Sequence, residues 1–356
     1  MTSLMRAAVW HGPNDLRVEQ RPIPEATPGS VVVRVRACTI CGSDLRILRD
    51  GNPRIVEPRV LGHEVAGDVV AVGSGAKRFQ VGDRVAVGAD VPCGECVHCR
   101  EGRANCCDVN LAIGYQFDGG FAEYLRLEPL VVDLGPVRII DRSVDYAAAA
   151  LAEPLACCLN GYERALLRPG ATVAIFGAGP IGLMLAMLAP TLGASRVLMI
   201  EPLAARRESA ARLPAIDVTI DPAAVDPVEA VMQHTGGIGA DVIFTACAEV
   251  ATHGQAIAMV AKRGVVNLFG GLPSTAPPVE LLSNHLHYRE AYVTGSHGAT
   301  PEHHAQALAL IESRAVDVTP LLSASYGIAD IGRAFEHAGR RDSLKVVVRA
   351  DEQSAT

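Results

Sequence analysis

Four cysteines that lie close together in the sequence form the clearest group of metal-binding side chains. Cys93, Cys96 and Cys99 fall within seven residues, and Cys107 follows eight residues later. Zinc held by four thiolates is tetrahedral and has no vacant position for a substrate, so this spacing predicts a structural zinc site. Cys106 is the alternative fourth ligand, because it directly precedes Cys107.

A second candidate metal site combines residues from separate parts of the chain. His63 and Glu64 stand near the start of the segment 61–73, whose small and β-branched residues predict a strand. Cys41 adds a thiolate, and Glu153 offers a second carboxylate beside that of Glu64. Three protein ligands plus one exchangeable position are the arrangement of a catalytic zinc. The residue types alone leave open which glutamate is the third ligand.

A glycine-rich turn with the pattern G-x-G-x-x-G is the third candidate site. The turn follows an apolar strand at 172–176 and opens a predicted helix at 181–192. In this context the first glycine permits the tight turn, the second lets the backbone approach a pyrophosphate, and the third allows close helix packing. The helix N-terminus also favours the phosphate charge. The predicted cofactor-binding residues are Gly177, Gly179, Pro180, Ile181, Gly182, Glu201 and Arg206.

Glu201 sets the expected choice of cofactor. It ends the next predicted strand, nineteen residues after Gly182, where an acidic side chain holds the ribose hydroxyls of a dinucleotide. A carboxylate there would repel a 2′-phosphate, so NAD is favoured over NADP. Arg206 and Arg207 are close enough in the sequence to temper that preference.

The pattern of apolar residues changes near residue 145. Before it, short alternating runs such as 31–37 predict a β-rich, barrel-like domain. After it, strands alternate with helices, which is typical of βαβ units and a parallel sheet. The predicted strands are 172–176, 196–200, 242–245 and 265–269, and the predicted helices are 181–192 and 204–213. Beyond about residue 294 the pattern is mixed and ends in a predicted strand at 343–349.

Length and composition limit the classes of function. A chain of 356 residues exceeds the usual size of a single hydrophobic core, so we expect two domains. The net charge of −7 argues against a nucleic-acid partner. The first residues lack the apolar core of a signal peptide, and the uncharged stretch between Arg168 and Arg196 fits a buried strand and helix better than a membrane span. We therefore expect a cytoplasmic protein with no membrane partner.

In combination, these motifs resemble the zinc-dependent medium-chain dehydrogenase family over nearly the whole chain. The matching features are Cys41–Asp44, Gly62-His63-Glu64 with Gly67 and Gly73, the four-cysteine group, Glu153-Pro154 and the glycine fingerprint. The resemblance implies an α/β protein with a GroES-like β-rich catalytic domain at 1–155 and 295–356. It also implies a Rossmann domain, a doubly wound parallel sheet, at 156–294.

With glutamate at position 153, the chain resembles the sorbitol (polyol), threonine and glucose dehydrogenase branch of the family. The resemblance implies a catalytic zinc held by Cys41, His63 and one or both of Glu64 and Glu153, with Glu64 favoured. It also implies a second, structural zinc and hydride transfer between a secondary alcohol and NAD. Ser43 matches the hydroxyl that hydrogen-bonds the reacting oxygen. Relatives assemble as homodimers or homotetramers.

One position departs from the family pattern. Where relatives often carry a relay histidine three residues after the serine, this chain has Arg46, which stays protonated and cannot pass a proton along. Arg46 and Arg49 either pair with an anionic substrate or lie solvated at the surface. Tyr115 and Phe117 are candidates either to line the substrate pocket or to pack in the core.

The expected substrate is a polyol, cyclitol or sugar alcohol, oxidised to a ketone. Two enzymatic alternatives are a dehydrogenase of an anionic polyol phosphate and one of an amino alcohol. A non-catalytic NAD- or zinc-binding protein is the alternative from another class, although such a protein would be expected to have lost a ligand. The cysteine group argues against a zinc-free quinone reductase.

Overall fold

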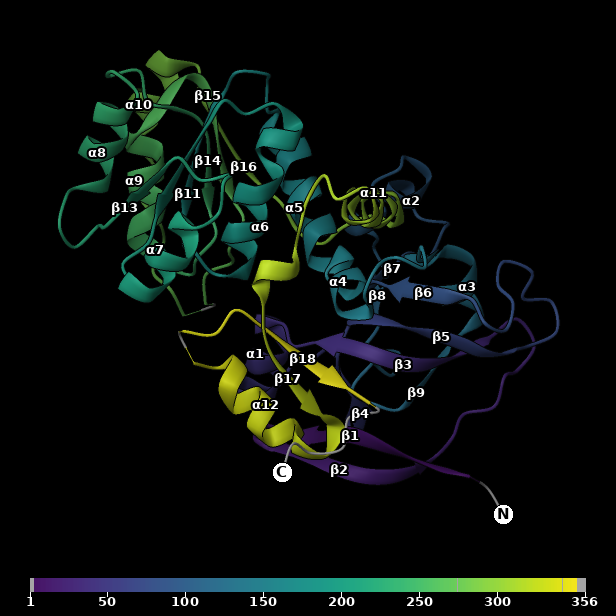
Figure 1. Ribbon diagram of the computed structural model, residues 1–356. Coiled ribbons are helices and arrows are strands. Elements are labelled where there is room, and N and C mark those ends of the chain that lie inside the picture. Colours follow the sequence, from purple (N-terminus) through teal and green to yellow (C-terminus); the bar gives the residue numbers. More distant parts are fainter. Residues whose placement is uncertain (1–2, 274, 341, 351–356) are drawn as a thin grey trace. The chain divides into compact units, whose positions relative to one another are not determined.

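The computed structural model of the chain describes residues 3–273, 275–340 and 342–350 (Figure 1). The chain divides into two compact units. Unit 1 contains Met1–Ala156 and Gly298–Thr356, and unit 2 contains Cys157–His297.

Unit 1 consists mainly of β-structure. Its strands are β1 (Leu4–Gly12), β2 (Asp15–Pro22), β3 (Val31–Thr39), β4 (Arg59–Val60), β5 (Glu64–Val72), β6 (Arg84–Val87), β7 (Asp90–Val91), β8 (Leu111–Ala112), β9 (Tyr124–Leu127), β10 (Val137–Ile139), β17 (Leu322–Gly327) and β18 (Lys345–Arg349). The largest sheet has the order β10-β6-β5-β3-β18-β17, with β9 also paired to β3. A second sheet has the order β2-β1-β4, and β7 pairs with β8. The predicted β-rich character of this part of the chain is confirmed.

The register of β3 decides which residues meet where β3, β5 and β18 end, within the large sheet. In the antiparallel pair β3·β5, Thr39 lies opposite Glu64, so Cys41, just beyond β3, approaches His63, just before β5. In the antiparallel pair β18·β3, Val347 lies opposite Thr39, so Lys345 comes to the same place. Three segments distant in sequence therefore end side by side.

The helical segments of unit 1 are mostly short. They are α1 (Gly42–Asp50), α2 (Val97–Arg100), η1 (Ala104–Cys106), α3 (Pro129–Leu134), α4 (Tyr146–Ala150), α11 (Pro301–Glu312), η3 (Thr319–Leu321), η4 (Ile328–Asp330) and α12 (Ile331–Ala338). Helix α5 (Ala152–Ala165) runs across the division between the two units.

Unit 2 is an α/β unit around a six-stranded parallel sheet. Its strands are β11 (Thr172–Phe176), β12 (Arg196–Ile200), β13 (Val218–Ile220), β14 (Ala240–Thr245), β15 (Val260–Leu268) and β16 (Tyr292–Gly295). Its helices are α6 (Pro180–Leu188), η2 (Pro190–Leu192), α7 (Ala204–Ala211), α8 (Pro227–His234), α9 (Val250–Ala258) and α10 (Ser283–Arg289). Helix α6 lies on one face of the sheet and α8, α9 and α10 on the other (Figure 1).

The strand order β13-β12-β11-β14-β15-β16 is that of a Rossmann sheet, because in sequence order within the unit it runs 3-2-1-4-5-6. All its pairings are parallel. The predicted strands 172–176 and 196–200 are confirmed with these bounds. The predicted doubly wound parallel sheet is therefore confirmed.

Several predicted boundaries in unit 2 were wrong: β14 begins at Ala240 rather than 242, α7 ends at Ala211 rather than 213, and two larger differences have identifiable reasons. The predicted helix 181–192 ends as α6 at Leu188, and a 3₁₀ turn follows at Pro190, which has no N–H to continue an α-helix. Strand β15 begins at Val260 rather than 265, because a register irregularity and two charged residues, Lys262 and Arg263, interrupt its apolar pattern.

The uncharged stretch between Arg168 and Arg196 forms β11, α6 and η2, and most residues of β11 and α6 are buried in unit 2. Within the described residues, the chain has no helix with the length and apolar character needed to cross a membrane.

Candidate functional site

Cys41, His63 and Glu64 meet where β3 ends and β5 begins, in the large sheet of unit 1. Their ligand atoms, one thiol sulfur, one imidazole nitrogen and one carboxylate oxygen, all lie within 4.8 Å of one another. Cys41 is the N-cap residue of α1, and its backbone N–H donates to Asp44 Oδ2 at 2.9 Å. The start of the helix therefore holds the cysteine in place.

The two ring nitrogens of His63 have different neighbours. Nε2 lies 3.4 Å from the Ser43 hydroxyl, and Nδ1 lies 3.5 Å from Asp44 Oδ1. Burial opposes protonation of His63, but the Asp44 carboxylate outweighs it and raises the pKa of the imidazole well above its ordinary value. A carboxylate beside the second nitrogen is the usual way in which proteins orient a metal-binding histidine. Sequence analysis included Asp44 in a motif but gave it no role.

Glu64 forms a buried ion pair that sequence analysis missed. Lys345 Nζ contacts both carboxylate oxygens, at 2.6 Å for Oε2, and the Thr39 hydroxyl donates to Oε2. The side chains of Lys345 and Glu64 are 3 % and 0 % exposed. Burial alone would lower the pKa of Lys345, but Glu64 raises it well above its ordinary value. A lysine within an apolar C-terminal strand was the signal available in the sequence.

Glu153 lies near this group without joining it. Among the described residues, the set of ligand atoms within 4.8 Å contains Glu64 and not Glu153. Glu153 is buried, and burial raises its pKa to about 8, helped by the negative charge of Glu64 and opposed by His63. The carboxyl is close enough to His63 to interact through its charge.

The donor set of this group suits zinc. Thiolate, imidazole and carboxylate are the three ligand types that zinc accepts, and three of them leave one tetrahedral position for a substrate oxygen. The Ser43 hydroxyl stands 3.4 Å from His63 Nε2, beside this group. The arrangement therefore fits a metal that polarises an alcohol next to a hydrogen-bonding hydroxyl.

The four sulfur atoms of Cys93, Cys96, Cys99 and Cys107 also lie within 4.8 Å of one another. Cys99 Sγ is 3.9 Å from Cys93 Sγ and 3.5 Å from Cys96 Sγ. A tetrahedron with zinc–sulfur bonds of about 2.3 Å has edges of about 3.8 Å, so the spacing fits one zinc ion. Cys106, the alternative ligand, is exposed and outside this group.

Backbone donors favour the thiolate form of Cys107. Burial raises the pKa of this thiol, but N–H groups of Asn110, Cys93 and Val109 outweigh it and lower the pKa to about 6. The Cys93 N–H lies 3.3 Å from Cys107 Sγ. A thiolate is the form that binds metal.

In unit 2, the glycine fingerprint forms the turn between β11 and α6. Gly177 has φ of +98°, which L side chains rarely adopt, and a Cβ on Gly182 would lie 1.8 Å from the Gly177 carbonyl oxygen. Gly179 is the N-cap of α6, with Pro180 and Ile181 in its first turn. The turn therefore requires glycine at the first and third positions and directs a helix N-terminus outward.

Glu201 follows β12 next to this turn. Its Oε2 accepts from Ala178 N at 2.7 Å, and its Oε1 accepts from Leu203 N at 2.9 Å. Arg206 Nη1 lies 3.6 Å from where a Cβ on Gly179 would stand, and its buried Nε has no hydrogen-bond partner among the described residues. Arg207 is held in an ion pair with Asp221. Of the two arginines, Arg206 is the one directed at the glycine turn.

Other predicted residues lie apart from these groups. Arg46 is exposed on α1, and Arg49 pairs with Asp50 at the surface. Tyr115 and Phe117 both pack against the hydrophobic core, and the Tyr115 ring centroid also lies 6.2 Å from that of His63. Arg49 is thus an ordinary surface ion pair, and Tyr115 faces the metal-binding group.

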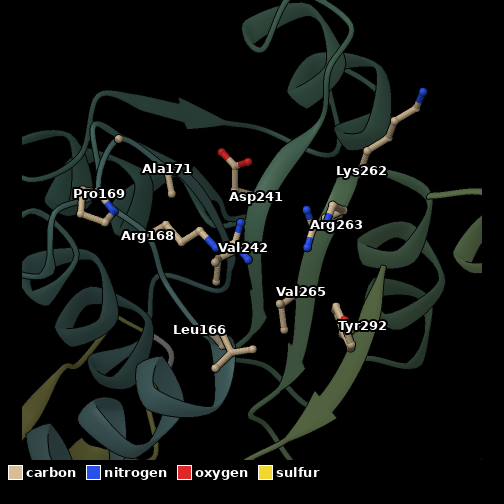
Figure 2. Close-up of a pocket in the computed structure, with 12 residues that line it drawn as sticks. Leu166, Arg168, Pro169, Ala171, Asp241, Val242, Lys262, Arg263, Val265 and Tyr292 are labelled. Carbon is tan, nitrogen blue, oxygen red and sulfur yellow. The ribbon is translucent and has the colours of Figure 1, made fainter. Parts of the chain in front are cut away.

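A cavity of about 320 Å³ in unit 2 is separate from the glycine turn. It lies between the amino ends of neighbouring strands, lined by Ala171 before β11, Asp241 in β14, Lys262 in β15 and Tyr292 in β16 (Figure 2). Dinucleotides bind at the carboxyl ends of the strands in such sheets. This cavity is therefore at the wrong end of the sheet for the cofactor.

Comparisons with known proteins agree with the fold and the donor sets. Residues 27–134 match the family model of the alcohol dehydrogenase GroES-like domain, and residues 180–313 match that of the zinc-binding dehydrogenase. The chain is 38 % identical to sorbitol dehydrogenase of Bacillus subtilis (strain 168) over 276 residues, 76 % of each chain. It is 31 % identical to L-galactonate-5-dehydrogenase of Escherichia coli (strain K12), over 97 % of this chain and 99 % of the relative.

Among solved structures, a protein described as a zinc-binding dehydrogenase from Sinorhizobium meliloti 1021, bound to NADP, superposes with a TM-score of 0.91. It is 32 % identical, and the match covers 98 % of this chain and 99 % of that one. The chain therefore belongs to the zinc-dependent medium-chain dehydrogenase family, and it is a dehydrogenase with a GroES-like and a Rossmann-type fold.

Proposed function

We propose that the protein transfers a hydride between a secondary alcohol of a polyol, cyclitol or sugar alcohol and NAD, using a catalytic zinc ion. The observation that carries this proposal is the group of Cys41, His63 and Glu64, whose ligand atoms lie within 4.8 Å of one another. The Ser43 hydroxyl, 3.4 Å from His63 Nε2, supports it, because a hydroxyl there can hydrogen-bond the reacting oxygen. The sorbitol dehydrogenase relative supports the substrate class.

The residues of the site have separate roles in holding the metal, orienting the ligands and balancing charge. Cys41, His63 and Glu64 would hold the catalytic zinc, with Glu153 as the alternative carboxylate ligand. When bound, zinc supplies a Lewis acid that polarises the substrate oxygen, and NAD supplies the hydride acceptor. Asp44 orients the His63 ring, and Lys345 neutralises Glu64 in the form seen here.

Proton removal begins at Ser43. Its hydroxyl lies 3.4 Å from His63 Nε2 and can accept the alcohol proton as it donates its own. Arg46 is exposed and always protonated, so it does not carry the proton onward. The proton therefore leaves through water, the cofactor ribose or another group.

The cofactor part of the proposal rests on the glycine turn and Glu201. Gly177, Gly179 and Gly182 would take the pyrophosphate at the start of α6, with Pro180 and Ile181 in the same turn. The buried Glu201 carboxylate favours NAD, and Arg206 is the residue that would tolerate a 2′-phosphate. The NADP-bound relative keeps NADP as the second candidate.

The wider organisation is also proposed. The catalytic domain comprises 1–155 and 295–356, and the cofactor domain comprises 156–294. Two zinc ions per chain follow from the two donor sets, with the structural ion held by the cysteine group. A homodimer or homotetramer is supported by β16, which is the edge strand of its sheet and exposes Tyr292.

The direct test is a panel of polyols, cyclitols, aldonates and amino alcohols, incubated with zinc-loaded protein and NAD or NADP while the absorbance of the reduced cofactor is followed. We expect turnover of at least one secondary alcohol, faster with NAD. The L-galactonate-5-dehydrogenase relative makes an anionic polyol the second candidate substrate. No turnover by protein of confirmed zinc content would instead favour a non-catalytic NAD- and zinc-binding protein.

A further inference from the structure

Tyr115 connects the metal-binding group of unit 1 to a nearby loop. Its ring lies 6.2 Å from that of His63, at 56°. Burial raises the pKa of the phenol, Asp44 and Cys41 raise it further, and His63 and the Ser43 hydroxyl lower it. The phenol is therefore within electrostatic range of the residues proposed to carry the reaction.

Arg54 stacks on this tyrosine. Its guanidinium carbon is 5.4 Å from the centroid of the Tyr115 ring, and Nη2 donates to the carbonyl of Asn110. The loop that carries it is also held through its backbone, since Gln116 Nε2 donates to the Arg54 carbonyl at 2.9 Å. The Arg54 backbone N–H also donates to Asn52 Oδ1 at 2.9 Å. Both the base and the tip of this exposed side chain are thus positioned.

No acidic side chain lies within ion-pair distance of Arg54 among the described residues. The two arginines nearest to it in the sequence differ, because Arg49 pairs with Asp50 at 2.7 Å and Arg59 with Asp118 at 3.1 Å. A guanidinium has five N–H donors in a planar fork, and the Asn110 carbonyl accepts from one nitrogen only. The other donors are available to a carboxylate or phosphate, which Arg binds in a bidentate manner.

The separation suits a short sugar chain. The two ring contacts of 6.2 and 5.4 Å put the guanidinium at most about 12 Å from the His63 ring. A five- or six-carbon chain with a terminal acid group, built from bonds of about 1.5 Å, extends roughly 7 to 9 Å from the reacting carbon. One molecule can therefore reach both places.

We infer that Arg54 and Tyr115 form a specificity site for an anionic polyol, a sugar-derived chain that ends in a carboxylate or a phosphate. This inference rests on the proposed function of the same site. The acid group binds the Arg54 fork, the hydroxyl of Tyr115 hydrogen-bonds the middle of the chain, and the secondary alcohol to be oxidised lies beside Ser43. Arg54 takes the part that sequence analysis had offered to Arg46 and Arg49.

The test compares three six-carbon substrates that differ at one end: a hexitol, a hexonate and a hexitol phosphate. Each is assayed with wild type, with Arg54→Met, which keeps an apolar chain on Tyr115 without the charge, and with Arg54→Lys. Arg49→Met is the matched control, because it removes a paired arginine. Calorimetric titration of hexonate and hexitol phosphate measures binding without turnover.

We expect wild type to prefer at least one anionic substrate over the hexitol in kcat/KM. Arg54→Met should lower kcat/KM for that substrate by about 10- to 100-fold, mainly through KM, and weaken its calorimetric binding to the same extent. The same variant should change the hexitol by less than about twofold, and Arg49→Met should change nothing. In Arg54→Lys, the preference for hexitol phosphate over hexitol should be retained better than the preference for hexonate over hexitol, since lysine acts as a point charge.

Equal losses on neutral and anionic substrates would overturn the inference, and so would hexitol turnover with no anionic preference. In both cases the proposed oxidoreductase activity stands. Absence of turnover on all three substrates overturns the proposed function for these polyols. In that event, hexonate or phosphate binding that is lost in Arg54→Met would still support anion recognition, and no binding would refute it.

Discussion

Lys345 is a sensitive probe of this site, because it is the positive partner of a fully buried glutamate. Substituting Lys345→Met keeps an unbranched side chain of similar length in β18 and removes the charge. Glu64 would then retain only the Thr39 hydroxyl among the partners seen here. We predict that this single change destabilises unit 1 strongly.

The size of the effect follows from burial. The side chains of Lys345 and Glu64 are 3 % and 0 % exposed, so water hardly screens their charges. Removing one member of such a buried pair costs about 3 to 5 kcal/mol, because an uncompensated charge remains. Removing both, in Glu64→Gln/Lys345→Met, should cost clearly less than the sum of the two single changes.

Trp10 provides the assay. It is the only tryptophan of the chain, is 2 % exposed, and lies in the same hydrophobic cluster as Val65 and Val346, the neighbours of Glu64 and Lys345. Its fluorescence during denaturant unfolding therefore reports on unit 1, even where the two units unfold separately. The four proteins of the double-mutant cycle are compared at equal zinc content.

A loss below about 1 kcal/mol in Lys345→Met would mean that Glu64 is neutralised by something other than this lysine. If the two single changes were additive in the double variant, the two side chains would not be coupled and the ion pair would not stabilise unit 1.

Three further predictions concern other parts of the chain. His304 is buried and has no hydrogen-bond partner among the described residues, and burial together with the nearby Arg138 lowers its pKa to about 3. Stability should therefore fall as the pH drops below the unfolded pKa near 6.5, and the loss due to His304 should reach about 2 kcal/mol by pH 5. This loss, followed through Trp10 fluorescence, should disappear in His304→Leu. Cys107→Ser should lower the zinc content by about one ion per chain and leave the Cys41 site loaded, as metal analysis would show; retention of both ions would contradict the four-sulfur site. Glu201→Gln should raise the NADP-to-NAD ratio of kcat/KM by roughly tenfold, and an unchanged ratio would remove Glu201 from cofactor selection.

What the sequence predicted well depends on residues close together in the chain. The glycine turn, β11 and β12 were predictable because turn geometry and apolar runs are local properties. The cysteine group was predictable for the same reason, since its ligands span fifteen residues.

Contacts set by strand register were not predictable. Lys345 reaches Glu64 across 281 residues because β18 pairs with β3, and nothing in the local sequence specifies that pairing. Arg54 likewise meets Tyr115 through the packing of two loops. Sequence spacing also leaves the choice between Glu64 and Glu153 open, because it depends on distances between segments that are far apart in the chain.

Zinc content and turnover, measured on the same preparation of Cys41→Ala, test whether Cys41 belongs to a catalytic metal site. Wild type should carry about two zinc ions and oxidise a secondary alcohol with NAD. The variant should carry about one ion, show no turnover above background, and unfold with the Trp10 transition of a folded unit 1. Turnover at the wild-type rate, or full zinc content in the variant, would contradict the assignment of Cys41, His63 and Glu64 as the catalytic metal site.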